Sequence, residues 1–236
     1  MKKQAKLSIH GVKYILRMCL QLLFQTGVLF IAAGTFDIGI RLLAYLILLA
    51  GSYVLSLVMI VRRNPKVLNE RTKNMRINTK SWDKILLSAY VICAFLILNV
   101  FIGLDIRYGW LHIDFGYCFI GLLLYVFSMV VNTKSMIENN YFESSSRIQS
   151  ERDQTVISTG TYSMVRHPGY SSIIIWALSI PLLTGAVCTL IPTVFIVIII
   201  SVRTFLEDRM LKKRVGRIPR ILPKSKIPTG TLSLVG

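Results

Sequence analysis

The chain has 236 residues, of which 53% are hydrophobic, and its formal net charge at pH 7 is +17. The apolar fraction and a positive mean hydropathy argue against a soluble domain and predict a membrane protein. The basic residues lie between apolar runs rather than on one polar face. We therefore interpret them as topology signals and lipid-headgroup contacts, and expect no nucleic-acid partner.

The first four apolar runs are residues 14–34, 42–61, 85–104 and 115–131. Each has, or comes close to, the ~20 apolar residues that a helix needs to cross ~30 Å of hydrocarbon. Arg17, Gln21 and Gln25 recur at helical spacing in the first run, so we expect them to form a polar stripe that faces other helices.

The last apolar region, residues 171–202, is too long for one helix and contains Pro181, Gly185 and Pro192. Proline and glycine interrupt helices, so this region predicts two short helices joined near residues 184–186 as a hairpin. The predicted fold class is therefore all-α: a polytopic membrane helix bundle with four full spans plus a C-terminal helical hairpin.

The loops predict the orientation of the bundle. The loop between the second and third spans is strongly basic, with Arg62, Arg63, Lys66, Arg71, Lys73, Arg76, Lys80 and Lys84. By the positive-inside rule this loop is cytosolic, as is the N-terminus with its lysines. Counting crossings onward places residues 133–170 and the segment after residue 202 on the cytosolic side as well.

The four cysteines lie inside apolar segments, widely separated and without a CxxC or Cys/His spacing: Cys19, Cys93, Cys118 and Cys188. We interpret them as small packing residues, and the sequence indicates neither a disulfide framework nor a metal site.

A polar stretch, residues 156–170, reads VISTGTYSMVRHPGY and directly precedes the last apolar region. Arg166 and His167 stand before Pro168, which favours a turn or a helix start there. One interpretation is a simple membrane-boundary cap, with a snorkelling arginine and a tyrosine in the aromatic belt. The other is a site for chemistry.

A second polar cluster, Arg203, Glu207 and Asp208, follows the last span. Arg203 and Glu207 are i and i+4 on a continuing helix and share a face. They could form an ordinary surface ion pair, worth well under ~1 kcal/mol. If the hairpin returns the chain to the side it left, however, this cluster lies beside the turn at residues 166–170.

Together these residues resemble a family of integral-membrane methyltransferases. The resemblance is carried by Gly160-Thr161-Tyr162, then Val165-Arg166-His167-Pro168-Gly169-Tyr170, the apolar hairpin, Arg203, and the pair Glu207-Asp208. It is closest to the bacterial branch that is called isoprenylcysteine carboxyl methyltransferase-like, with further similarity at Arg147-Ile148-Gln149 and Thr79-Lys80-Ser81-Trp82-Asp83-Lys84. The family also includes the phospholipid N-methyltransferases. The similar region covers roughly residues 64–211.

The resemblance implies S-adenosyl-L-methionine bound at the cytosolic end and a lipid or prenylated acceptor that enters from the bilayer. It implies a bacterial cytoplasmic membrane as the location and needs no metal. The cofactor-binding residues it implies are Gln149, Gln154, Thr155, Val156, Ile157, Tyr162, His167, Pro168, Tyr170 and Glu207. Arg203, which would orient the acceptor, and Arg166 are the catalytic candidates. The position of Gln154 often holds histidine in the relatives, so one cofactor contact would be altered. Thr161 and Ser163 replace the usual proline and arginine, and we expect these two replacements to be tolerated.

Three functions stay open at this point. Carboxyl O-methylation of a prenylated thiol compound competes with N-methylation of a phospholipid headgroup, and Arg203 slightly favours a carboxylate acceptor. A catalytically silent membrane scaffold of the same fold is the third. A membrane reductase with a nicotinamide cofactor would need a larger number of spans and a phosphate-binding cluster, which the sequence does not show.

The sequence suggests three regions: N-terminal transmembrane helices (1–62), a methyltransferase core with a cytosolic cofactor loop and the hairpin (63–213), and an atypical tail (214–236). Relatives continue after this point with a segment like GYxEYxxxVxYRLxPxxW. Synonymous codons from Lys212 on can be chosen so that reading one base later gives KNELDGYPEYSQKVKYRLVPFLW and a stop. We hypothesise that the tail is out of frame, which would weaken activity.

Overall fold

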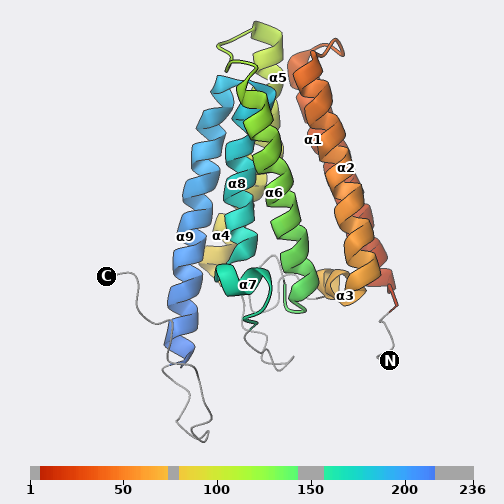
Figure 1. The fold of residues 1–236 in the computed structure, drawn as a ribbon, viewed down its shortest axis with the longest axis vertical. Helices are drawn as coiled ribbons and strands as arrows, with labels where there is room; N and C mark the ends of the chain where they lie inside the picture. Colours follow the sequence, from red (N-terminus) through yellow and green to blue (C-terminus); the bar gives the residue numbers. More distant parts are fainter. Residues whose placement is uncertain (1–5, 74–79, 143–156, 216–236) are drawn as a thin grey trace, which may run out of the picture.

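The protein is a bundle of long helices (Figure 1). The computed structural model describes residues 6–73, 80–142 and 157–215, and these contain no β-strand. Five helical segments are long and apolar enough to cross a membrane: Ile9–Ala33, Ile40–Arg63, Ser81–Tyr108, Tyr117–Glu138 and Val187–Met210. The prediction of an all-α, polytopic membrane bundle is confirmed.

The four predicted spans match helical segments that extend beyond the apolar runs at one or both ends. Helices α1 (Ile9–Ala33) and α2 (Ile40–Arg63) form the first two. The third is continuous through α4 (Ser81–Ile92), a π-helical turn, η1 (Cys93–Ile97), and α5 (Leu98–Tyr108). Helix α6 (Tyr117–Glu138) is the fourth. The apolar runs thus locate the spans, while polar helix ends lengthen them.

The predicted hairpin consists of α8 (Pro168–Thr184), a short 3-10 turn, η3 (Val187–Thr189), and α9 (Leu190–Val215). It turns at Gly185, whose φ of 82° is favourable for glycine and whose N–H bonds the Pro181 carbonyl. The expectation of two short helices is wrong for α9, which has 26 residues. It continues beyond the apolar run because the charged residues that follow are good helix formers.

The hairpin packs closely against α6. A Cβ atom at Gly121 of α6 would lie 2.6 Å from the backbone nitrogen of Leu183, so the two helices touch backbone to backbone. Trp176, Ala177 and Ile180 of α8 are buried in the largest apolar cluster of the bundle. Helix α9 contacts both α8 and α4, so the ends of three helices come together near the start of α8.

The polar stripe of α1 behaves largely as predicted. Gln21 donates from Nε2 to the Tyr53 hydroxyl of α2 over 3.0 Å, and the side chain of Gln25 is buried. Arg17, in contrast, is exposed. The four cysteines are free thiols.

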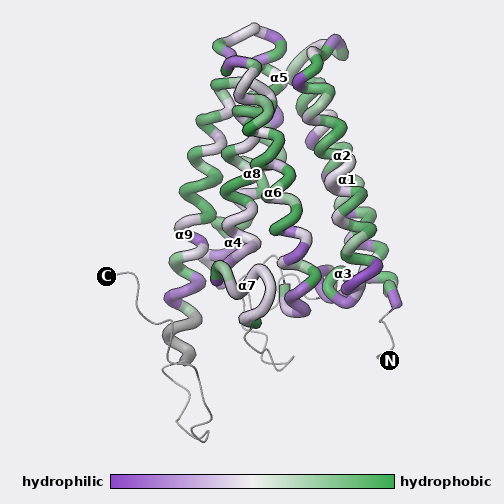
Figure 2. The backbone as a smooth tube through the Cα atoms, in the orientation of Figure 1, coloured by the Kyte–Doolittle hydropathy of each residue, from purple (hydrophilic) through white to green (hydrophobic). Residues whose placement is uncertain are grey.

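Two further helices lie at one end of the bundle, together with the N-terminal end of α1 (Figure 1). These are α3 (Pro65–Lys73) and α7 (Thr161–Met164). Figure 2 shows hydrophobic residues along the middle of the long helices and hydrophilic ones around α3 and the lower part of α9. The basic loop and both polar clusters therefore share one end of the molecule.

Candidate active site

The turn that precedes α8 is fixed by the end of α6. Gly160 has φ 60° and ψ −128°, and a Cβ atom there would collide with the carboxylate of Glu138. Glu138 accepts two hydrogen bonds at Oε2, one from the Thr161 N–H at 2.8 Å and one from its hydroxyl at 2.7 Å. Threonine thus supplies two donors at this position, neither of which a proline would have.

Tyr162 is held by the neighbouring residue of α6. Its hydroxyl accepts a hydrogen bond of 2.9 Å from Nδ2 of Asn139. Burial raises the pKa of Tyr162 to about 12; the carboxylates of Glu138 and Glu207 also raise it, whereas the Asn139 bond lowers it. The phenol is therefore neutral at physiological pH.

His167 stands just before the first residue of α8, Pro168, which is buried. The missing N–H of proline costs nothing at the first helical position, and its ring restricts the preceding residue to a non-helical backbone. His167 accordingly has φ −124° and ψ 67°. Its ring stacks on that of Tyr170, with centroids 5.5 Å apart and planes inclined by 19°.

The hairpin returns α9 to these two rings. Nε2 of His167 lies 2.7 Å from Oδ1 of Asp208, and the Tyr170 hydroxyl donates to Oε2 of Glu207 over 2.6 Å. The predicted meeting of the turn and the acidic pair is therefore present. Because both bonds involve a carboxylate, they are of the stronger, charge-assisted kind when the acid is ionised.

Arg203 lies one turn before Glu207 on α9 and is almost fully buried, with 2% of its surface exposed. Its guanidinium carbon lies 5.3 Å from the centre of the Tyr170 ring, a cation–π arrangement. Its Nε donates to Oδ1 of Asp83 of α4 over 2.7 Å. The interpretation of Arg203 as half of an exposed ion pair is thus wrong, since its side chain is inside the bundle.

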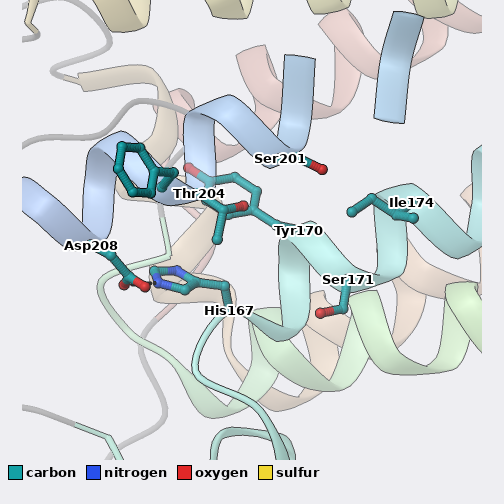
Figure 3. A pocket seen from close by; sticks show the side chains of 8 residues that line it. His167, Tyr170, Ser171, Ile174, Ser201, Thr204 and Asp208 are labelled. Carbon is teal, nitrogen blue, oxygen red and sulfur yellow. Dashed lines mark hydrogen bonds and ion pairs between the residues drawn. The ribbon is translucent and has the colours of Figure 1, made fainter. Parts of the chain in front are cut away.

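A cavity of about 320 Å³ opens between α8 and α9 beside these contacts (Figure 3). This volume lies within the range of about 300–1,000 Å³ that is typical of small-molecule sites. One end is polar, where His167 and Asp208 point toward each other, and Ile174 and Phe205 make the wall partly apolar. The remaining lining residues are Tyr170, Ser171, Ser201 and Thr204.

The other candidates from the sequence fall into two groups. Arg166 is exposed and does not line the cavity, and Ile157 is half-buried ahead of the Gly160 turn. The remaining ones lie outside the described residues: Gln149, Gln154, Thr155 and Val156.

No sequence pattern indicates a role for Asp83, Glu138 or Asn139, and Asp208 stands out only as part of an acidic pair. Asp83 was marked only by the similarity of its segment to relatives, because nothing local in the sequence connects it to Arg203, 120 positions away. Glu138 and Asn139 end an apolar helix, where polar residues are ordinary. Among the residues described, no cluster of three His, Cys, Asp or Glu side chains could hold a metal ion.

A comparison with protein families finds a similarity over the part of the chain that carries this site. Residues 120–213 match the sequence model of the isoprenylcysteine carboxyl methyltransferase family. This match supports assigning the chain to an isoprenylcysteine carboxyl methyltransferase-like family. It covers most of α6 and all of α7 and α8, and extends along α9 to residue 213. No curated protein and no solved structure matches the chain.

Proposed function

We propose that the protein transfers a methyl group from S-adenosyl-L-methionine to a lipophilic acceptor at the cytosolic face of the membrane. The observation that carries the proposal is the pair of contacts between α8 and α9, His167 with Asp208 and Tyr170 with Glu207, beside a cavity at one end of the bundle. The family match over the same helices supports it.

The residues around the cavity suit this cofactor. When bound, S-adenosyl-L-methionine supplies an electrophilic methyl group on a sulfonium cation. Tyr170 lines the cavity, and Glu207 and Asp208 offer carboxylate oxygens for the charged and hydroxyl groups of the cofactor. The resemblance to the family adds Ile157, Tyr162 and Pro168 as cofactor contacts, although none of the three lines the cavity. It also adds four residues that lie outside the described part of the chain: Gln149, Gln154, Thr155 and Val156.

The protein's contribution to methyl transfer is alignment and exclusion of water. Such a displacement needs the acceptor atom in line with the methyl group, and a dry site strengthens the attraction between opposite charges. An acceptor carboxylate is already ionised at neutral pH and requires no base. The apolar side chains of Ile174 and Phe205 at the cavity fit an acceptor that carries a hydrocarbon chain.

The acceptor that the family match favours is the carboxyl group of a prenylated cysteine, with Arg203 and Arg166 as the cations that attract it. N-methylation of a phospholipid headgroup is the second candidate. It is favoured by the bond between Arg203 and Asp83, because a cation that already has a carboxylate partner attracts an acceptor carboxylate less strongly.

The cytosolic orientation is supported by the distribution of charge. The end of the bundle that holds the site carries basic residues on several helices, among them Lys13, Arg62, Arg63 and Lys66. At the opposite end, the loops near Asp37 and Asp114 are nearly balanced in charge. By the positive-inside rule, this distribution of charge supports a site that faces the cytosol.

The test incubates methyl-labelled S-adenosyl-L-methionine with membranes that contain the protein, and then separates the lipid and prenylated fractions. We expect label in one of these fractions, and its identity distinguishes O-methylation from N-methylation. Glu207→Gln should abolish the transfer, whereas Asp37→Asn, at the other end of the bundle, should not. Wild-type protein that neither binds nor consumes the cofactor would instead be a silent scaffold.

A further inference from the structure

Asp83 lies outside the region that matches the family, yet it bonds Arg203 beside the site. It is in the first turn of α4 and is completely buried. Its Oδ1 accepts the 2.7 Å hydrogen bond from Nε of Arg203. Asp83 itself does not line the cavity between α8 and α9, so any effect on a bound ligand must pass through another side chain.

Arg203 is placed so that it can transmit such an effect. Its guanidinium lies over the Tyr170 ring at 5.3 Å, and Tyr170 holds Glu207 by the 2.6 Å hydrogen bond. Glu207 is four residues after Arg203 on α9, which is the spacing at which side chains of opposite charge meet on a helix. The buried guanidinium therefore has carboxylates on two sides, Asp83 on α4 and Glu207 on its own helix.

We propose that Asp83 is a positioning residue: it holds Arg203 against Tyr170, so that the guanidinium does not draw Glu207 away from the Tyr170 hydroxyl. Glu207 then keeps the hydrogen bond that it accepts from the Tyr170 hydroxyl. A buried cation that loses its partner is expected to rearrange and pair with the nearest remaining carboxylate, because an uncompensated charge in a low-dielectric interior is strongly unfavourable. Without Asp83, that carboxylate is Glu207.

This inference rests on the proposed function, since it assigns Glu207 to the cofactor. The plainer role for an acid in the first turn of a helix is to stabilise the helix dipole. That role requires no particular partner, whereas the carboxylate of Asp83 directly bonds Arg203. The two roles differ in one consequence: only a positioning role makes the effect of Asp83 depend on the presence of Arg203.

The test measures equilibrium binding of labelled S-adenosyl-L-methionine to the full-length protein in detergent, together with the thermal unfolding midpoint without cofactor. The variants are Asp83→Asn, Arg203→Gln and the double variant. Asp105→Asn is the matched control, because Asp105 is also buried and lies at the other end of the same span, beside His112. We expect Asp83→Asn to weaken cofactor binding at least tenfold, and the control to stay within about twofold of wild type.

The decisive comparison is made in the Arg203→Gln background. In that background Asp83→Asn should cause no further loss of cofactor affinity, because the guanidinium that would draw Glu207 away from Tyr170 is absent. Asp83→Asn that binds like wild type, or a double variant that binds markedly worse than Arg203→Gln, would overturn the inference. If Asp83→Asn alone does not fold, the double variant should fold and bind like Arg203→Gln, and its failure to do so counts against positioning. Wild-type protein that does not bind the cofactor overturns the proposed function itself, and this inference with it.

Discussion

His167 and Asp208 are 41 residues apart in sequence, yet Nε2 of the imidazole lies 2.7 Å from Oδ1 of the carboxylate. The contact exists because α8 and α9 form a hairpin that returns the chain to the end of the bundle where α8 began. Tyr170, one turn further along α8, makes the equivalent contact with Glu207, the residue before Asp208. The site is therefore a property of the hairpin as a unit.

A double-mutant cycle on His167 and Asp208 tests that contact. We expect His167→Gln and Asp208→Asn each to weaken cofactor binding, and the double variant to be little worse than either single one. Residues in direct contact give non-additive effects, with coupling of about 0.5–3 kcal/mol. Equilibrium binding in detergent measures it, and strictly additive losses would mean that the two side chains act separately.

Tyr162 gives a prediction about alkaline pH. An exposed tyrosine in the unfolded chain has a pKa of about 10, whereas burial raises the pKa of Tyr162 to about 12. The fold favours the neutral phenol, so its contribution to stability is complete below about pH 10 and is lost as the pH rises toward about 12. The stability difference between wild type and Tyr162→Phe should thus shrink through this window in denaturation experiments. A difference that grows there would contradict it.

Gly121 tests the close packing of α6 on the hairpin. An added Cβ meets the α8 backbone at 2.6 Å, and backbone cannot move aside easily. We expect Gly121→Ala to destabilise the protein by about 1–3 kcal/mol and to impair cofactor binding, because α8 carries the site. Gly51→Ala is the matched control: it is also in a membrane helix, but a Cβ there meets nothing within 4 Å. Equal thermal midpoints for the two variants would refute the packing argument.

The segment after residue 213 allows a genetic test of the reading-frame hypothesis. The family match ends at that residue. Restoring the alternative frame from Lys212 on should raise methyl transfer in membranes several-fold at equal protein level. An unaltered rate, or an intact adenine count on resequencing of the codons for Lys212 and Lys213, would dispose of the hypothesis.

The sequence predicted the spans, the turn near Gly185 and the meeting of His167 and Tyr170 with the acidic pair, because each depends on local patterns or on the family motif. Apolar run length did not reveal the extent of α9, since helix formation continues into residues that are no longer apolar. The sequence also could not reveal the hydrogen bond between Arg203 and Asp83. That contact depends on how α4 packs against α9, and tertiary packing between distant helices leaves no periodic signal in one sequence.

The same limit explains Glu138 and Asn139. Both end α6 and look like ordinary polar residues at a membrane boundary, but together they hold Thr161 and Tyr162 in place. The substitution of threonine for the usual proline is compatible with this arrangement because the Thr161 hydroxyl bonds Glu138. The supporting residues of the site were therefore found only in the structure.

Ultraviolet cross-linking of labelled S-adenosyl-L-methionine to the purified protein, followed by peptide sequencing, tests the central claim most directly. We expect label on peptides that contain residues 167–174 or 201–208, and its loss when unlabelled cofactor is added in excess. Label confined to the opposite end of the bundle, or label that excess cofactor does not displace, would contradict a methyltransferase site between α8 and α9.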